Sequence, residues 1–279
     1  MNLSLAYSPC PNDTYIFYAL AHGKIRMENL EFDIRLNDVE ALNQAAKAGA
    51  ADISKLSFAA LGHLLDAYGL LRTGAALGRG CGPLVVGRSG ADLSKLSEAA
   101  VAVPGLWTTA HLLLGLFCPT RPRTLPMRFD RIMPAVAEGS VDFGVIIHEG
   151  RFTYEEYGLV NLLDLGAWWE SETGLPIPLG GIAARRSLLP EVIQKTETGI
   201  RESILYARSH PEETRAYVRA HAQELSDRVT DQHIGLYVND FSLDIGESGT
   251  AAVWALFSRA REKGLLPAGP KNLFALPDS

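Results

Sequence analysis

The 279-residue sequence has few cysteines, and they form no recognisable pattern. Cys10, Cys81 and Cys118 are odd in number and widely spaced, without a C-x-x-C pair. This spacing supports neither a disulfide framework nor a zinc site. Free thiols are typical of reducing compartments, so we expect a cytoplasmic protein that holds no metal.

An excess of positive charge is also missing. The sequence has 26 Lys and Arg against 32 Asp and Glu, which gives a formal net charge of −6. Nucleic acids and anionic membranes require a basic face, so we expect neither as a partner. An acidic chain can still bind a small anion when backbone N–H groups and hydroxyls make the contacts. The oligomeric state is left open between monomer and dimer.

No apolar run reaches the roughly 18 residues that a membrane span requires. The N-terminal stretch before Pro9 and Pro11 has neither a basic region nor a long apolar region, so we expect no secretory signal. Hydrophobic residues make up 47% of the chain and charged residues 21%, which is typical of a globular protein. A chain of this length accommodates two lobes of ordinary size.

Short β-like runs alternate with helical stretches along most of the chain. The expected strands are 3–7, 30–36, 52–57, 83–86, 100–103, one near Met127, 141–147 and 181–184. The expected helices are 15–21, 38–48 with Asp38 as N-cap, 58–68, 108–117 and 132–137, and 188–265 is almost wholly helical. This alternation predicts an α/β fold with parallel sheets and right-handed crossovers.

The strands at 83–86 and 181–184 bracket a self-contained α/β unit. An inserted lobe with two hinge crossings produces this order. We therefore predict one lobe formed by residues 1–86 and 181–279, and a second lobe formed by residues 87–180.

Polar side chains follow several predicted strands, where open parallel sheets bind their ligands. These residues are Ser8, Asn12, Asp13 and Thr14 after the first strand, Lys55 and Ser57 at the third, and Thr108 and Thr109 after the strand 100–103. Free N–H groups and the helix dipole favour an anion at such positions. Any one of these sites is better explained as an N-cap than as a substrate contact. Together they predict a cleft for a small carboxylate-bearing substrate.

His148 is carried to this cleft by a predicted strand that ends at Ile147. An imidazole titrates near neutral pH, so it can accept and return a proton there. A loop hydrogen bond explains its position equally well. The other six histidines have ordinary explanations: His22 ends a helix, His210 precedes a proline, and His63, His111, His221 and His233 fit helical periodicity.

Several apparent motifs lack residues or a sequence context that the corresponding sites require. The pair His148-Glu149 does not begin a zinc helix, because Phe152 stands where H-E-x-x-H requires histidine. The segment 78–83 (GRGCGP) lacks the G-K-[ST] of a phosphate loop, and its glycines are expected to give backbone freedom beside the first hinge. We expect Cys10 to be a packing residue rather than an activated thiol, and the pair 168–169 (WW) to pack in the core or between lobes.

With these segments in hand, the sequence resembles the 1,4-dihydroxy-6-naphthoate synthase family of the futalosine route to menaquinone. The matching segments are 8–14 (SPCPNDT), 55–57 (KLS), 78–83 (GRGCGP), 103–105 (VPG), 108–110 (TTA), 147–149 (IHE), 151–154 (RFTY), 164–169 (DLGAWW), 223–226 (QELS), 237–239 (YVN) and 241–243 (FSL). The likeness covers nearly the whole chain, with variable stretches around 88–98 and 119–127.

The resemblance implies a type II periplasmic-binding-protein-like fold converted from carrying solutes to catalysis. The implied substrate is cyclic dehypoxanthine futalosine, and the products are 1,4-dihydroxy-6-naphthoate and dihydroxyacetone. His148 would be the proton acceptor. The residues implied to contact substrate are Lys55, Leu56, Ser57, Thr109 and Ala110.

We expect Thr108 and Thr109, with the N–H groups that follow them, to bind an anion or oxyanion, and Asn12 and Ser57 to orient the substrate. Aromatisation of the product ring supplies driving force, so no cofactor or metal is expected. Two alternatives share the fold: a chorismate dehydratase-like sister enzyme and a non-catalytic small-anion binding protein. The segments 147–149 and 151–154 favour the lyase over the dehydratase.

Overall fold

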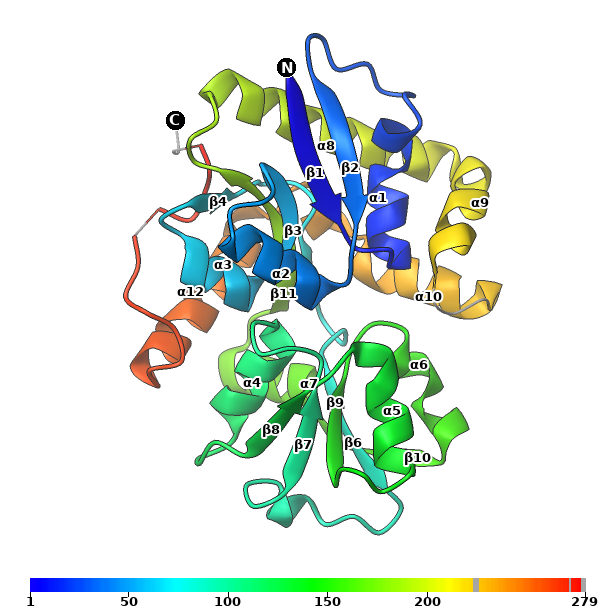
Figure 1. The fold of residues 1–279 in the computed structure, drawn as a ribbon, viewed down its shortest axis with the longest axis vertical. Coiled ribbons are helices and arrows are strands. Elements are labelled where there is room, and N and C mark those ends of the chain that lie inside the picture. The colour runs from blue at the N-terminus through cyan, green and yellow to red at the C-terminus, as the bar shows by residue number, and fades with distance from the viewer. Residues whose placement is uncertain (223–225, 271, 277–279) are drawn as a thin grey trace.

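The computed structural model describes residues 1–222, 226–270 and 272–276 (Figure 1). Two mixed sheets, each flanked by helices, form two lobes stacked along the long axis of the molecule. Residues 223–225 of the matching segment 223–226 lie outside the described residues.

The first sheet takes its strands from the N-terminal part of the chain and from residues 177–185. Its strands are β1 (Asn2–Tyr7), β2 (Glu31–Leu36), β3 (Ile53–Ser57), β11 (Ile177–Arg185) and β4 (Tyr68–Leu70), in the order β2-β1-β3-β11-β4, with β5 (Ala76–Gly78) paired to β11. β1 runs parallel to β2 and β3, as predicted. The prediction of an all-parallel sheet is wrong at β11, which returns from the second lobe and pairs antiparallel with β3, β4 and β5.

The second sheet lies wholly within the middle of the chain. Its order is β10 (Leu159–Asp164), β6 (Leu84–Arg88), β9 (Phe143–Ile146), β7 (Ala100–Val103) and β8 (Arg123–Pro126). β7 is parallel to β8 and β9, whereas β6 is antiparallel to β9 and β10. Both sheets therefore have a parallel βαβ centre and an antiparallel strand at the crossing between lobes.

The helices largely follow the apolar periodicity of the sequence. They are α1 (Pro11–Ala21), α2 (Val39–Lys47), α3 (Phe58–Leu64), α4 (Thr109–Phe117), α5 (Phe129–Ala137), α6 (Gly150–Thr153), α7 (Leu165–Thr173), α8 (Pro190–Ser209), α9 (Pro211–His221), α10 (Asp227–Tyr237), α11 (Asp240–Leu243) and α12 (Gly246–Glu262), with 3₁₀ turns η1 (Leu93–Lys95) and η2 (Tyr154–Tyr157). Asp38 caps α2 as predicted. The helix expected at 15–21 begins earlier, because proline is favourable in a first turn. The helix expected at 58–68 ends at Leu64, and Tyr68 belongs to β4.

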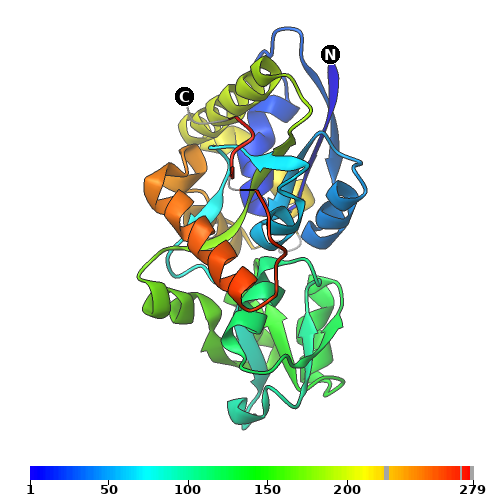
Figure 2. The same cartoon turned by 90° about the vertical axis from the view of Figure 1, so that its left-hand side faces the viewer.

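The chain crosses between the sheets twice, from β5 to β6 and from α7 to β11. At the first crossing a Cβ on Gly82 would lie 2.3 Å from the Cα of Gly166, so this backbone contact requires glycine. One buried apolar cluster joins side chains of both lobes, among them Leu56 of β3 and Leu113 of α4. α12 contacts α3 and α4, and Figure 2 shows it beside the junction. The lobe boundaries stay a prediction, and β6 extends across the one expected at 86/87.

Among the described residues, no helix combines the length and apolar character needed to cross a membrane.

Candidate active site

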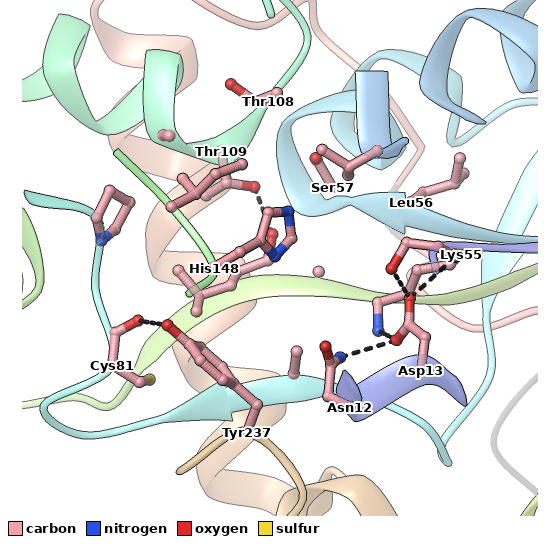
Figure 3. Close-up of a pocket in the computed structure, with 18 of the residues that line it drawn as sticks. Asn12, Asp13, Lys55, Leu56, Ser57, Cys81, Thr108, Thr109, His148 and Tyr237 are labelled. Carbon is pink, nitrogen blue, oxygen red and sulfur yellow. Dashed lines mark hydrogen bonds and ion pairs between the residues drawn. The ribbon is translucent and has the colours of Figure 1, made fainter. Parts of the chain in front are cut away.

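A pocket that encloses about 680 Å³ of empty space, open solvent included, lies between the two lobes (Figure 3). Its wall contains the eight residues expected to contact the substrate or its proton: Asn12, Lys55, Leu56, Ser57, Thr108, Thr109, Ala110 and His148. They come from β3 and from the starts of α1 and α4, together with the loop that follows β9. The junctions expected to converge do converge. The wall also contains Ser8 and Asp13, which the sequence placed after the first strand, but Thr14 of that group does not line it. Cys81, His233 and Tyr237 line it as well, and the sequence did not predict their part.

His148 lies at the centre of this group (Figure 3). Its backbone has φ of +56°, a left-handed conformation that is uncommon outside glycine and that turns the chain sharply after β9. The ring packs edge-on against Phe129, with centroids 5.2 Å apart. Strain of this kind occurs where surrounding structure holds a functional side chain in place.

The two ring nitrogens of His148 have different surroundings. Nδ1 lies 3.4 Å from the Sγ of Cys10, and Nε2 is buried without a hydrogen-bond partner among the described residues. Burial lowers the pKa of His148 to about 4, with Asp13 opposing and Lys55 adding to the shift. The imidazole is therefore neutral at neutral pH, as a general base must be.

Cys10 is buried directly before α1. Burial, reinforced by the negative charge of Glu149, raises the pKa of this thiol well above its usual value. A neutral thiol is a weak nucleophile, which supports the expectation of a packing residue over an activated thiol. Its contact with the ring of His148 is an additional role that the sequence did not predict.

Cys10, His148 and Glu149 are the one group of the described chain whose ligand atoms could hold a metal ion, all lying within 4.8 Å of one another. Sulfur, nitrogen and carboxylate donors of this kind suit zinc. A metal would need the thiolate form of Cys10, which burial disfavours, and would occupy a lone pair of His148. The donor set therefore fits a metal poorly, and we derive no step through one.

A buried ion pair lies along one wall of the cavity. Lys55 donates to Oδ1 of Asp13, and their side chains are 7% and 1% exposed. The hydroxyl of Ser8 donates to Oδ2 of Asp13 at 2.7 Å, and the amide of Asn12 donates to Oδ1 at 2.8 Å. Buried charges need such partners, so much of the positive charge of Lys55 is balanced before any substrate enters.

The network continues to a histidine that the sequence analysis set aside. Nε2 of His233 lies 2.9 Å from Oδ1 of Asn12, and the residue is fully buried. Its ring contacts that of Tyr237, with centroids 4.5 Å apart, and lies 6.3 Å from that of His148. The helical periodicity around His233 was correctly recognised, but it did not reveal that α10 turns His233 and Tyr237, four residues apart, towards the cavity.

The hydroxyls at the start of α4 have protein partners. Thr108 caps the helix by accepting from the N–H of His111, and it donates to the carbonyl of Gly105. Thr109 donates to the carbonyl of Leu179 at 2.6 Å. The N–H groups of Thr109 and Ala110 occupy the first two positions of the helix, where the helix itself offers no acceptor. These N–H groups are therefore better placed to receive an anion than the threonine hydroxyls.

The loop before α4 forms hydrogen bonds with α2 of the opposite lobe. The N–H of Trp107 donates to Oε2 of Glu40 at 3.2 Å, and the amide of Asn43 donates to the carbonyl of Trp107 at 3.3 Å. Oδ1 of Asn43 also accepts from the N–H of Ser57 at 3.0 Å. Asn43 is fully buried, and burial raises the pKa of Glu40. This contact, which we call the Glu40–Trp107 latch, was not predicted because a backbone N–H and a side chain 67 positions apart meet only through tertiary packing.

A family model described as menaquinone biosynthesis matches residues 3–262 of the chain. A 1,4-dihydroxy-6-naphtoate synthase of Thermus thermophilus is 52% identical over 272 residues, covering 98% of each chain. A protein of the same name from Streptomyces coelicolor is 48% identical over 280 residues, covering 99% of this chain and 98% of the relative.

Solved structures agree on the fold. A protein of Archaeoglobus fulgidus superposes with a TM-score of 0.90 at 38% identity, covering 95% of this chain and 98% of that one. A periplasmic aliphatic sulphonate binding protein of Escherichia coli superposes with a TM-score of 0.66 at 13% identity, covering 96% and 89%. The fold is the two-lobed periplasmic-binding-protein-like fold, as the family resemblance implied.

Proposed function

The chain belongs to the menaquinone biosynthesis family, and from this premise we propose that it is a 1,4-dihydroxy-6-naphthoate synthase. The reaction is cleavage of cyclic dehypoxanthine futalosine to 1,4-dihydroxy-6-naphthoate and dihydroxyacetone. The observation that carries the proposal is the free, buried Nε2 of a neutral imidazole in an inter-lobe cavity. We further propose that the protein works in the cytoplasm as a monomer or dimer, on a small carboxylate and without nucleic acid or membrane.

The first proposed step is removal of a proton from the substrate. Nε2 of His148 accepts the proton of a substrate hydroxyl, and that oxygen becomes a carbonyl as the adjacent carbon–carbon bond breaks. The electron pair of the broken bond passes to the fused ring, which becomes aromatic. The ring system leaves as the naphthoate and the sugar-derived carbons as dihydroxyacetone, so no oxidant or reductant is consumed.

The surroundings of His148 match this role. The base form requires hydrogen on Nδ1, where the sulfur of Cys10 at 3.4 Å is the acceptor. The ring becomes positive when it takes the proton, and the negative charge of Asp13 favours that form. His148 is thus neutral before the reaction and stabilised after it.

The N-terminus of α4 is the proposed binding site for negative charge on the substrate. The N–H groups of Thr109 and Ala110, at the positive end of the helix dipole, are the proposed donors to a carboxylate or developing oxyanion. Lys55, Leu56, Ser57 and Asn12 line the facing wall from the other lobe and are the proposed orienting contacts. Lobe closure then excludes water from the reacting atoms.

The test is product analysis with purified protein. Incubation with cyclic dehypoxanthine futalosine should release the naphthoate and dihydroxyacetone in equal amounts, measured by liquid chromatography and mass spectrometry. A parallel incubation with chorismate should leave chorismate unchanged. Conversion of chorismate alone would identify a dehydratase, and tight binding without conversion of either compound would identify a binding protein.

A further inference from the structure

The orientation of the Asn12 amide is fixed by its neighbours. The carboxylate of Asp13 accepts hydrogen bonds from Lys55 and Ser8, so the group facing it from Asn12 must be the donating NH₂. The amide oxygen then faces Nε2 of His233 at 2.9 Å. An amide oxygen only accepts, so Nε2 of His233 carries a hydrogen.

The other nitrogen of His233 is therefore the one with a lone pair. Burial is the main cause that lowers the pKa of His233 well below its usual value, and the charge of Lys55, together with that of His148 whenever it is protonated, lowers it further, so the ring stays neutral. Nδ1 is buried and has no hydrogen-bond partner among the described residues. A buried acceptor without a donor is destabilising, so its presence requires an explanation.

We propose that Nδ1 of His233 binds substrate by accepting a hydrogen bond from a substrate hydroxyl. The Lys55–Asp13–Asn12 chain holds the ring in the tautomer that accepts there and does not donate. The ring lies 6.3 Å from that of His148 and both residues line the same cavity, so they are close enough for one polyhydroxylated substrate to reach both. This role rests on the proposed function and deepens it, because it selects a hydroxyl over a carbonyl or carboxylate at that position.

Two substitutions separate this role from a purely structural one. His233→Asn places an amide near the position of Nδ1 and keeps an acceptor for substrate, but loses the contact with Asn12. His233→Gln places its amide near the position of Nε2 and keeps the contact with Asn12, but loses the acceptor. We expect kcat/KM of H233Q to fall about tenfold further than that of H233N, mainly through KM, at matched melting temperatures. A structural role predicts the opposite order and would overturn the proposal.

A second measurement tests the tautomer without substrate. Two-dimensional ¹⁵N NMR of the histidine side chains, assigned by loss of the His233 signals in H233N, should show hydrogen on Nε2 and a bare Nδ1. Hydrogen on Nδ1, or a charged ring at neutral pH, would overturn the inference. Wild-type protein that fails to cleave the futalosine-derived substrate would overturn the proposed function together with this role. A reversed order of the variants with wild-type turnover intact would overturn this role alone.

Discussion

The Nδ1 atom of His148 lies 3.4 Å from the sulfur of Cys10, although 138 positions separate the two residues in sequence. Cys10 precedes the first helix of one lobe, and His148 follows β9 of the other. The contact therefore spans the cleft and engages Nδ1, so Nε2 is the ring nitrogen without a protein partner among the described residues. A base whose second nitrogen is held in this way presents its lone pair in one direction.

Removing the sulfur should weaken catalysis without abolishing it. In Cys10→Ala the Nδ1–H of His148 loses its acceptor, and we expect kcat to fall about fivefold, equivalent to about 1 kcal/mol. Cys10→Ser keeps an acceptor and should retain most of the wild-type rate. Steady-state kinetics of both variants, with melting temperatures as the folding control, provide the measurement. Equal rates for C10A and C10S would argue against the contact.

The pH profile should reflect the buried environment of His148. Burial disfavours the charged ring and lowers its pKa to about 4, so the neutral base persists well below the usual histidine range. The groups around it are Asp13, Lys55, Asp38, Cys10, Glu149 and His233. We expect kcat/KM to stay level from pH 8 down to about 5 and to fall at lower pH as the ring becomes protonated. A decline already centred near pH 6.5, with circular dichroism unchanged, would contradict this environment.

The buried ion pair of Lys55 and Asp13 should contribute to the stability of the folded protein. Lys55→Met leaves the carboxylate of Asp13 buried without its cation, which costs about 3–5 kcal/mol. For a chain of this size that corresponds to a melting temperature lower by about 10 °C. The double variant Asp13→Asn with Lys55→Met removes both charges and should lose less. Calorimetry of the three proteins gives the comparison, and a double variant less stable than K55M would refute the account.

The Glu40–Trp107 latch should control closure of the lobes. Glu40→Ala removes the acceptor for the Trp107 N–H, and we expect KM to rise about tenfold with a smaller change in kcat. At Gly105, with φ of +150°, an added Cβ would lie 2.4 Å from the Glu40 carboxylate. Gly105→Ala should therefore impair the enzyme more than E40A.

The matched control for the latch is the double variant. Combining E40A with G105A relieves the contact with the carboxylate, so the double variant should be no worse than G105A alone. Losses that simply multiply would show that the two positions act independently and that the latch does not exist.

Much of the fold follows from sequence pattern alone. The strand at 100–103, the Asp38 cap and the convergence of polar strand ends all follow from local rules of periodicity and capping. The antiparallel direction of β11 does not follow from pattern, because a short apolar run does not indicate the direction in which a strand enters a sheet. Short elements such as β4 and β5 carry too few residues to show a period.

The site was predictable only where residues adjoin a strand end. His148, Ser57 and Thr109 were found in this way. His233 was not, because it approaches from α10, a helix whose periodicity gives no sign of which face meets the other lobe. Its importance depends on the amide of Asn12, more than two hundred residues away in sequence. Contacts of that range are decided by tertiary packing.

The central claim is that His148 removes the substrate proton, and His148→Ala tests it most directly. Turnover of cyclic dehypoxanthine futalosine should be compared between wild type and H148A at equal melting temperature, with added imidazole as chemical rescue. The account predicts a loss of kcat of about 10²- to 10⁴-fold with product still bound, and partial recovery with imidazole. A folded H148A protein that keeps more than about a tenth of the wild-type rate would contradict it, since a rate that close to wild type leaves the imidazole no part in proton transfer.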